Sequence, residues 1–205
     1  MVAKTRDPSY LLACGCSHTS GVGIEPHEIY VQLLADDLGL PLVNLAQSGS
    51  CARWVKHTLE NYLRNNSLLP GLVVVQWPNP FRTWEITANG QDQFSNVNRQ
   101  SLLFAARLRQ DPDGFWQEWI DSIERFAFHN TEIPIVDLCL ESHDFLAHHV
   151  AHLAEKDIVL HIDEKLPGKS WIFDSAASDG VHHSGRCHRL WADRLHEIVN
   201  ELAIR

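Results

Sequence analysis

The chain has 205 residues, 44% hydrophobic and 21% charged, and this length suits one domain, residues 1–205, with a sizeable core. The net charge is −9 with neutral histidines and the basic residues are scattered, so we expect no nucleic acid among its partners. No run approaches the roughly 20 apolar residues that span a membrane, and the first residues do not resemble a signal peptide. The five cysteines, an odd number, favour reduced thiols and a cytoplasmic location.

Apolar strands alternate with amphipathic helices along the chain. In order, the patterns predict a strand at 10–15, a helix at 26–40, a strand at 41–47, a helix at 50–66, a strand at 71–77, a helix at 115–130, a strand at 133–141, a helix at 143–157, a weak strand at 158–162 and a helix at 184–204. The strands are apolar throughout, which indicates a parallel sheet covered by helices on both faces. The predicted fold class is therefore α/β, a three-layer α/β/α sandwich.

Local signals refine the ends of these elements. Ser50 and Ser184 are candidate N-caps of the helices that follow them, and Gly39 is a candidate stop signal. Residues 80–114 are rich in Asn and Gln, and we expect an excursion there with a short helix near 100–109. We expect this insert to shape specificity.

Three polar segments directly follow predicted strands. They are GCSHT at 15–19, QSGS at 47–50 and WPNP at 77–80. Sites in doubly wound sheets form beyond the carboxyl ends of the strands, so we expect these segments to share one edge of the sheet. A fourth segment, DGVH at 179–182, precedes the last predicted helix.

Ser17, just after the first predicted strand, is a candidate nucleophile. A hydrolytic serine needs an imidazole to take its proton, a carboxylate to orient that imidazole, and donors for the developing oxyanion. Asp179 and His182 are three residues apart, which lets the carboxylate turn back to the imidazole. Gly49 and Asn79 follow the second and third strands, where a backbone N–H and a side-chain amide can donate.

These residues resemble the sequence blocks of the SGNH, or GDSL, hydrolase family, in order and over nearly the whole chain. The resemblance implies a flavodoxin-like sheet and serine-dependent cleavage or transfer of acyl esters, with no cofactor and no metal. It implies that Ser17 is the nucleophile, His182 the base and Asp179 its partner. It also implies an oxyanion hole formed by the N–H groups of Ser17 and Gly49 with Asn79. The implied partner is a small-molecule ester, and the oligomeric state stays open.

The sequence departs from the family pattern at two places. Cys16 stands where the family has aspartate, so the local hydrogen bonding must differ although the chemistry is retained. The family's Gly-x-Asn-Asp block is reduced to Asn79 between two prolines, which leaves Gln76 or Arg82 as alternative donors.

Other side chains at this edge are candidates for binding substrate. His18 neighbours Ser17 but diverges from it on a helix, so we expect it to line the pocket or be exposed instead of acting as the base. Trp77 and Arg82 follow the third strand, where they could line an acyl or alcohol pocket.

Rival interpretations stay open for several residues. Cys16 and Cys51 lie near predicted helix starts, where a thiol can be activated, although small buried cysteines are the commoner case. His148 and His152 share a helical face, and Cys187-His188 follow His182-His183, which allows a zinc site, although a solvated histidine-rich face is commoner. Two further functions are possible: an acyltransferase with the same triad, or a catalytically silent ligand-binding module.

Overall fold

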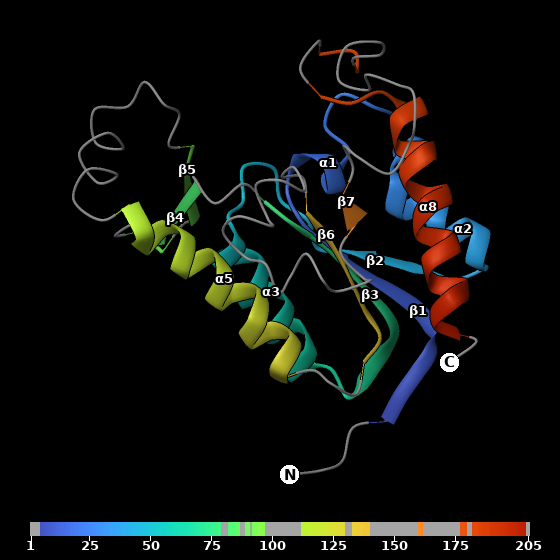
Figure 1. The fold of residues 1–205 in the computed structure, drawn as a ribbon, viewed down its shortest axis with the longest axis horizontal. Coiled ribbons are helices and arrows are strands. Elements are labelled where there is room, and N and C mark those ends of the chain that lie inside the picture. Colours follow the sequence, from blue (N-terminus) through green and yellow to red (C-terminus); the bar gives the residue numbers. More distant parts are fainter. Residues whose placement is uncertain are drawn as a thin grey trace.

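A computed structural model gives the arrangement of the chain (Figure 1). It describes residues 5–78, 82–86, 89–90, 92–96, 112–129, 133–139, 160–161, 177–179 and 182–203. The strands are β1 (Thr5–Cys14), β2 (Leu42–Asn44), β3 (Leu68–Trp77), β4 (Arg82–Ile86), β5 (Asp92–Asn96), β6 (Ile135–Cys139) and β7 (Leu160–His161). The helices are α1 (Ser17–Ser20), the 3-10 helix η1 (Pro26–Glu28), α2 (Tyr30–Leu38), α3 (Ala52–Asn65), α5 (Pro112–His129) and α8 (Gly185–Ala203).

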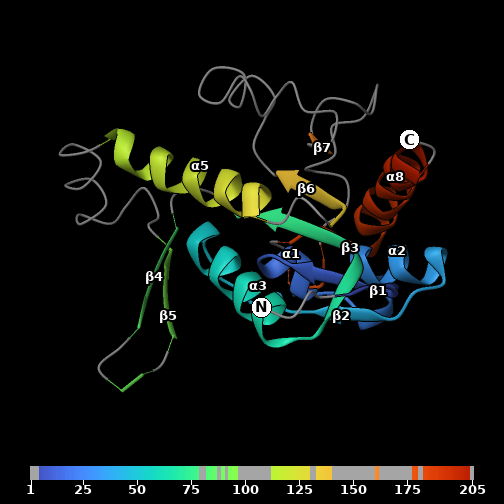
Figure 2. The same ribbon diagram turned by 90° about the horizontal axis from the view of Figure 1, so that it is seen from below.

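The central sheet has the order β2-β1-β3-β6-β7, and each pair of neighbours is parallel. Helices α2 and α8 pack together on one face, and α3 and α5 pack together on the other (Figure 2). Neighbouring residues of β1 enter different cores: Leu11 lies in the core with α2 and α8, and Leu12 in the core with α3. This arrangement confirms the predicted three-layer α/β/α sandwich with a flavodoxin-like sheet.

The strand order reverses direction between β1 and β3. From β1 the chain moves outward to β2, and from β3 it moves the other way to β6 and β7. In open α/β sheets the crevice at such a reversal, beyond the carboxyl ends of the strands, is where ligands bind. The segments that follow Cys14 and Trp77 therefore flank the expected position of a site.

Two strands extend further than predicted. The strand predicted at 71–77 begins earlier, at Leu68, so the boundary expected before Gly71 was wrong. The strand predicted at 10–15 likewise begins earlier, at Thr5. Pro70 pairs with Asp7, and the register shifts between Asp7 and Leu11. Proline fits an extended chain but donates no ladder hydrogen bond, so it interrupts the register without ending the strand.

The predicted helix at 26–40 is divided into η1 and α2 by Ile29, whose backbone is extended (φ −66°, ψ 130°). Gly39 ends α2 in the left-handed region (φ 66°), as its stop signal predicted. The last helix begins at Gly185, directly after Ser184, as expected.

Within the 80–114 excursion, β4 and β5 form an antiparallel hairpin that stands out from the body of the molecule (Figure 2). The predicted helices near 100–109 and at 143–157 lie outside the described residues. In the described part of the chain, none of the helices combines the length and apolar character that crossing a bilayer requires.

Candidate functional site

The chain turns sharply between β1 and α1, at Gly15. A Cβ atom at Gly15 would lie 2.3 Å from Thr19 Oγ1 and 2.9 Å from Gln76 Cβ, so the turn has room only for glycine. This close approach lets α1 begin at Ser17, three residues after β1 ends at Cys14. Ser17 is 4% exposed.

Replacing Gly15 with alanine should push α1 away from β3 and displace Ser17. We expect a loss of about 1–3 kcal/mol of stability from overpacking, and a fall of about 100-fold in the rate at which Ser17 reacts, since a shift of about 1 Å can cost that much. Gly39→Ala is the matched control: Gly39 has open space but a positive φ, so it should lose stability and keep its reactivity. Thermal melts measure the loss of stability, and the rate at which a fluorophosphonate labels Ser17 measures its reactivity. Equal labelling rates in the two variants would contradict the prediction.

Gln76 supports this turn from the end of β3. Its side chain is fully buried, and its Oε1 accepts from the Cys16 N–H at 2.9 Å and from Thr19 Oγ1 at 3.3 Å. Its Nε2 donates to Trp77 O at 3.1 Å. A side chain from the neighbouring strand β3 thus hydrogen-bonds two groups of the turn. Gln76 acts as a support, a function that the sequence did not suggest.

A second buried contact ties α1 to the helices on one face of the sheet. The hydroxyls of Thr19 and Tyr30 are 2.8 Å apart, and Tyr30 is fully buried. The Tyr30 N–H donates to His188 Nδ1 at 3.1 Å, which links α2 to α8. Burial raises the pKa of the Tyr30 hydroxyl, so it stays neutral and serves as a fixed hydrogen-bonding partner for Thr19.

The loop that contains Gly49, between β2 and α3, is attached to the turn at Gly15 through one carbonyl oxygen. Gly15 O accepts from the Gln47 N–H at 3.1 Å and from Ser50 Oγ at 3.0 Å. Gly49 between them has φ +83°, a conformation that favours glycine. The predicted N-cap at Ser50 was wrong: Cys51 occupies the N-cap position, because the Ser50 hydroxyl is committed to Gly15.

Asp179 and His182 form the pair that the sequence predicted. Asp179 Oδ2 lies 2.5 Å from His182 Nδ1, and Oδ1 accepts from the His182 backbone N–H at 3.0 Å. Both carboxylate oxygens therefore hold the same histidine. The side chains are partly exposed, 31% for Asp179 and 20% for His182, as a site that meets substrate requires.

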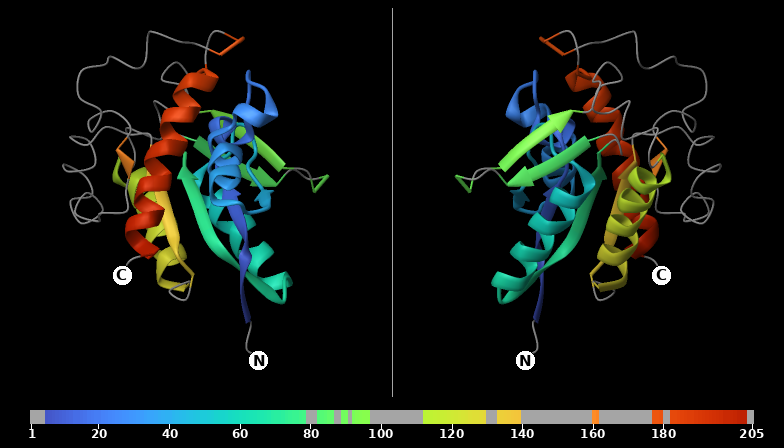
Figure 3. Two further views of the ribbon diagram at one scale, coloured as in Figure 1. Left: turned by 90° about the vertical axis from the view of Figure 1, so that its right-hand side faces the viewer. Right: turned by 90° about the vertical axis from the view of Figure 1, so that its left-hand side faces the viewer.

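The segment that follows α1 packs against the Asp179 loop. Gly23 O accepts from the Ser178 N–H at 3.0 Å and from Ser178 Oγ at 2.7 Å. Gly23 has φ +84°, and a Cβ there would lie 3.0 Å from Asp179 Cγ. The views in Figure 3 show the segment after β1 and the start of α8 at one end of the molecule, opposite the start of β1.

His182 also contacts α1 directly. Its ring centroid lies 5.2 Å from that of His18 at an interplanar angle of 67°. Burial lowers the pKa of His18 to about 3, with further lowering from the neighbouring histidines His183, His182 and His188 and from Arg82. His18 therefore lines the site as a neutral ring.

The Ser17 hydroxyl lies 3.9 Å from Cys16 Sγ. Within the described ranges no hydrogen bond joins Ser17 Oγ to His182, whose ring contacts His18, the next residue of α1. Catalytic hydrogen bonds often tighten only when substrate binds, and rotation about the Ser17 Cα–Cβ bond redirects the hydroxyl.

Of the other predicted site residues, Arg82 lies near the site, Trp77 lies in the core and Asn79 is not described. Arg82 Nη1 donates to Ser50 O at 3.4 Å, which places it beside the Gly49 loop. Trp77 is 1% exposed and donates through Nε1 to Asp137 Oδ1 at 2.7 Å, so it lies in the core instead of lining a pocket. Asn79 lies outside the described residues.

The thiol and metal alternatives gain no support here. Burial raises the pKa of Cys51, which disfavours a thiolate, and Cys16 is fully buried. In the ranges that the structure describes, no group of three or more His, Cys, Asp or Glu side chains is placed to hold a metal ion. His148 and His152 fall outside those ranges.

Two histidines of this region should make folding stability depend on pH. Burial is the main cause that lowers the pKa of His18 to about 3 and of His188 to about 4, from an ordinary value of 6.5. Below pH 6.5 these two histidines are protonated in the unfolded chain and stay neutral in the folded chain. The free energy of unfolding therefore falls as the pH drops from 6.5 toward 4. Urea titrations at several pH values should show this slope, and His18→Phe should make it shallower by about one proton. An unchanged slope in His18→Phe would contradict the assignment.

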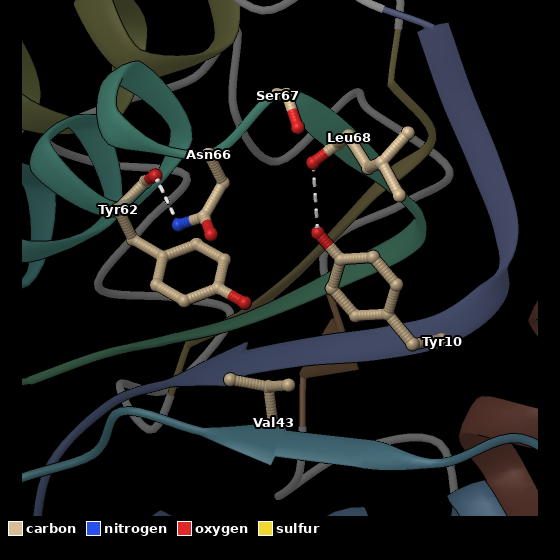
Figure 4. A pocket seen from close by; sticks show the side chains of 6 residues that line it. All are labelled: Tyr10, Val43, Tyr62, Asn66, Ser67 and Leu68. Atoms are coloured by element: carbon tan, nitrogen blue, oxygen red, sulfur yellow. Dashed lines mark hydrogen bonds between the residues drawn. The ribbon is translucent and has the colours of Figure 1, made fainter.

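A cavity of about 240 Å³ lies elsewhere (Figure 4). Its lining comes from β1, β2, the end of α3 and the start of β3, and consists of Tyr10, Val43, Tyr62, Asn66, Ser67 and Leu68. Tyr10 Oη donates at 3.1 Å to the backbone oxygen of Leu68, which is the first residue of β3. The cavity includes none of the predicted site residues.

No protein-family model and no curated protein matches the sequence. Similar solved structures include a lipolytic protein of the G-D-S-L family from Veillonella parvula, which is 14% identical, with 92% of this chain and 97% of that chain covered and a TM-score of 0.58. The esterase EstA from a Pseudoalteromonas species, in a structure inhibited by monoethylphosphonate, is 12% identical, with 96% and 100% covered and a TM-score of 0.59. A family 2 carbohydrate esterase with a carbohydrate-binding domain, from Corynascus thermopiles (Myceliophthora fergusii), is 13% identical, with 97% and 68% covered and a TM-score of 0.58. The chain thus has the three-layer fold that the G-D-S-L lipolytic proteins share with these esterases.

Proposed function

We propose that this protein is a serine hydrolase that cleaves carboxylic esters, such as acyl or acetyl esters of a small metabolite or sugar. The observation that carries the proposal is the Asp179–His182 pair, joined at 2.5 Å and lying against the helix that begins with Ser17. A binding pocket has no need for an imidazole whose Nδ1 is held by a carboxylate that also binds the backbone N–H of the same histidine. The shared fold with esterases of low identity is compatible with this reading.

In the proposed mechanism, Ser17 Oγ attacks the ester carbonyl while His182 accepts its proton. Asp179 holds Nδ1 of His182, which leaves Nε2 to accept, and its negative charge stabilises the imidazolium. Collapse of the tetrahedral intermediate breaks the bond to the alcohol oxygen, which takes the proton from His182. Water then attacks the acyl-enzyme with the same proton transfers, releasing the acid and restoring Ser17.

The oxyanion is proposed to be bound by the N–H groups of Ser17 and Gly49 with the side chain of Asn79. The backbone on which these two N–H groups lie is held in place. The Cys16 N–H, next to Ser17, donates to Gln76 Oε1, and the Ser50 hydroxyl, next to Gly49, donates to Gly15 O. Removal of one such donor costs about 100-fold to 1000-fold in turnover.

Adduct mapping with a fluorophosphonate tests the proposal. The wild-type protein is treated with the probe, digested, and analysed by mass spectrometry. We expect one adduct, on Ser17, with Ser20 and Ser50 as unmodified internal comparisons in the same region of the fold. No adduct would count against the nucleophile and would favour the silent binding module, whereas an adduct on another serine would assign the nucleophile to that serine.

Product analysis then separates hydrolysis from acyl transfer. A labelled acetyl ester is incubated with and without a sugar or alcohol acceptor, and free acid and transferred ester are both quantified. We expect free acid as the main product in both cases. A product that forms only with the acceptor would reassign the protein as an acyltransferase with the same triad.

A further inference from the structure

His18 lies in a cluster of rings that joins α1 to the start of α8. Its centroid is 5.2 Å from His182, 5.0 Å from His183 and 5.7 Å from Trp191. His183 and Trp191 are themselves 5.0 Å apart, so they hold His18 from the side of α8. The predicted base is thus in contact with a ring that α8 holds in place.

The Asp179 carboxylate alone does not fix the plane of the His182 ring. A hydrogen bond at Nδ1 sets one axis, and the imidazole can still tilt about the line from Nδ1 to Oδ2. The Nε2 atom lies off that line, so tilting moves it. The ring of His18 packs against that of His182 at an interplanar angle of 67°, a position from which it can oppose this tilt.

Two features of His18 suit this task. Its Nδ1 is buried and has no hydrogen-bond partner among the residues that the structure describes, where packing of the ring accounts for its position. Burial also keeps the ring neutral, and a neutral aromatic ring tolerates the positive charge that His182 carries during the reaction. A charged neighbour would oppose that charge.

We propose that His18 is a positioning residue, whose ring holds the plane of the His182 imidazole so that Nε2 meets the Ser17 hydroxyl. This inference rests on the proposed function, because it assigns His182 as the base. It gives the residue after the nucleophile a task separate from binding substrate.

The test compares three variants by rate and by spectrum. We expect His18→Ala to slow fluorophosphonate labelling of Ser17 by about 10-fold to 100-fold, and His18→Phe, which keeps a neutral ring, to stay within about threefold of wild type. His57→Ala is the matched control, since His57 also packs on a ring, that of Trp84 at 5.2 Å, on α3 away from this site. It should label at the wild-type rate.

Proton NMR supplies a readout that needs no catalysis. The proton shared by Asp179 and His182 should give a far-downfield signal in the wild type and in His18→Phe. It should broaden or vanish in His18→Ala, where the imidazole can tilt. An unchanged signal and labelling rate in His18→Ala would overturn this inference alone, and so would a loss in His18→Phe as large as that in His18→Ala. A wild type that shows the signal but is never labelled would instead overturn the proposed function.

Discussion

Ser17→Ala should reduce ester turnover to background, a loss of about 10⁴-fold to 10⁶-fold, because it removes the proposed nucleophile. The fold should survive, since the Ser17 hydroxyl contacts only a sulfur atom, at 3.9 Å, among the hydrogen bonds of the described residues. We expect the melting temperature to change by no more than a few degrees. Steady-state hydrolysis of p-nitrophenyl acetate and a thermal melt measure the two quantities.

Ser20→Ala is the matched control for this loss. Ser20 lies on the same short helix, and its hydroxyl donates to Ser17 O at 3.2 Å. Removing it changes the same turn without removing the proposed nucleophile. Turnover in Ser20→Ala should stay within about tenfold of wild type. If Ser17→Ala kept wild-type turnover, the nucleophile would have to be sought elsewhere.

Asp179→Asn should lower kcat by about 10⁴-fold while leaving the loop in place. The asparagine Oδ1 can still accept from the His182 N–H, but an amide NH₂ opposite Nδ1 favours the tautomer whose Nε2 carries the proton. That tautomer cannot take the proton of Ser17. Ser178→Ala is the control, since it removes a neighbouring hydrogen bond, to Gly23 O, without touching the imidazole.

Kinetics at fixed pH distinguish a tautomer effect from a general loss of structure. Asp179→Asn should lose kcat with little change in KM, and Ser178→Ala should change neither by more than a few-fold. Equal losses in the two variants would show that the loop, and not the carboxylate, matters.

Much of this fold could be predicted because its signals are local. The apolar strands and the stop at Gly39 are visible within a few residues. The Asp179–His182 pair also spans only three positions, so its spacing revealed the contact. The parallel sheet covered by helices followed from the apolar strands that alternate with helices, whereas its flavodoxin-like character was implied only by the family resemblance.

What could not be predicted depends on partners far away in the chain. Ser50 looks like an N-cap until the carbonyl of Gly15, 35 residues away, takes its hydroxyl. Trp77 looks like a pocket residue until Asp137, 60 residues away, accepts from its indole. The support from Gln76 likewise needs β1 and β3 side by side, which no short pattern reveals.

The attachment of the Gly49 loop to Gly15 O has a consequence for redesign. Libraries that randomise the stretch around Gly49 to gain new substrates will disturb, through the same oxygen, the turn that carries the proposed nucleophile Ser17. Gains in selectivity from that stretch will therefore be traded against rate. A designer who keeps Ser50 fixed retains the anchor and can vary the positions around it more freely.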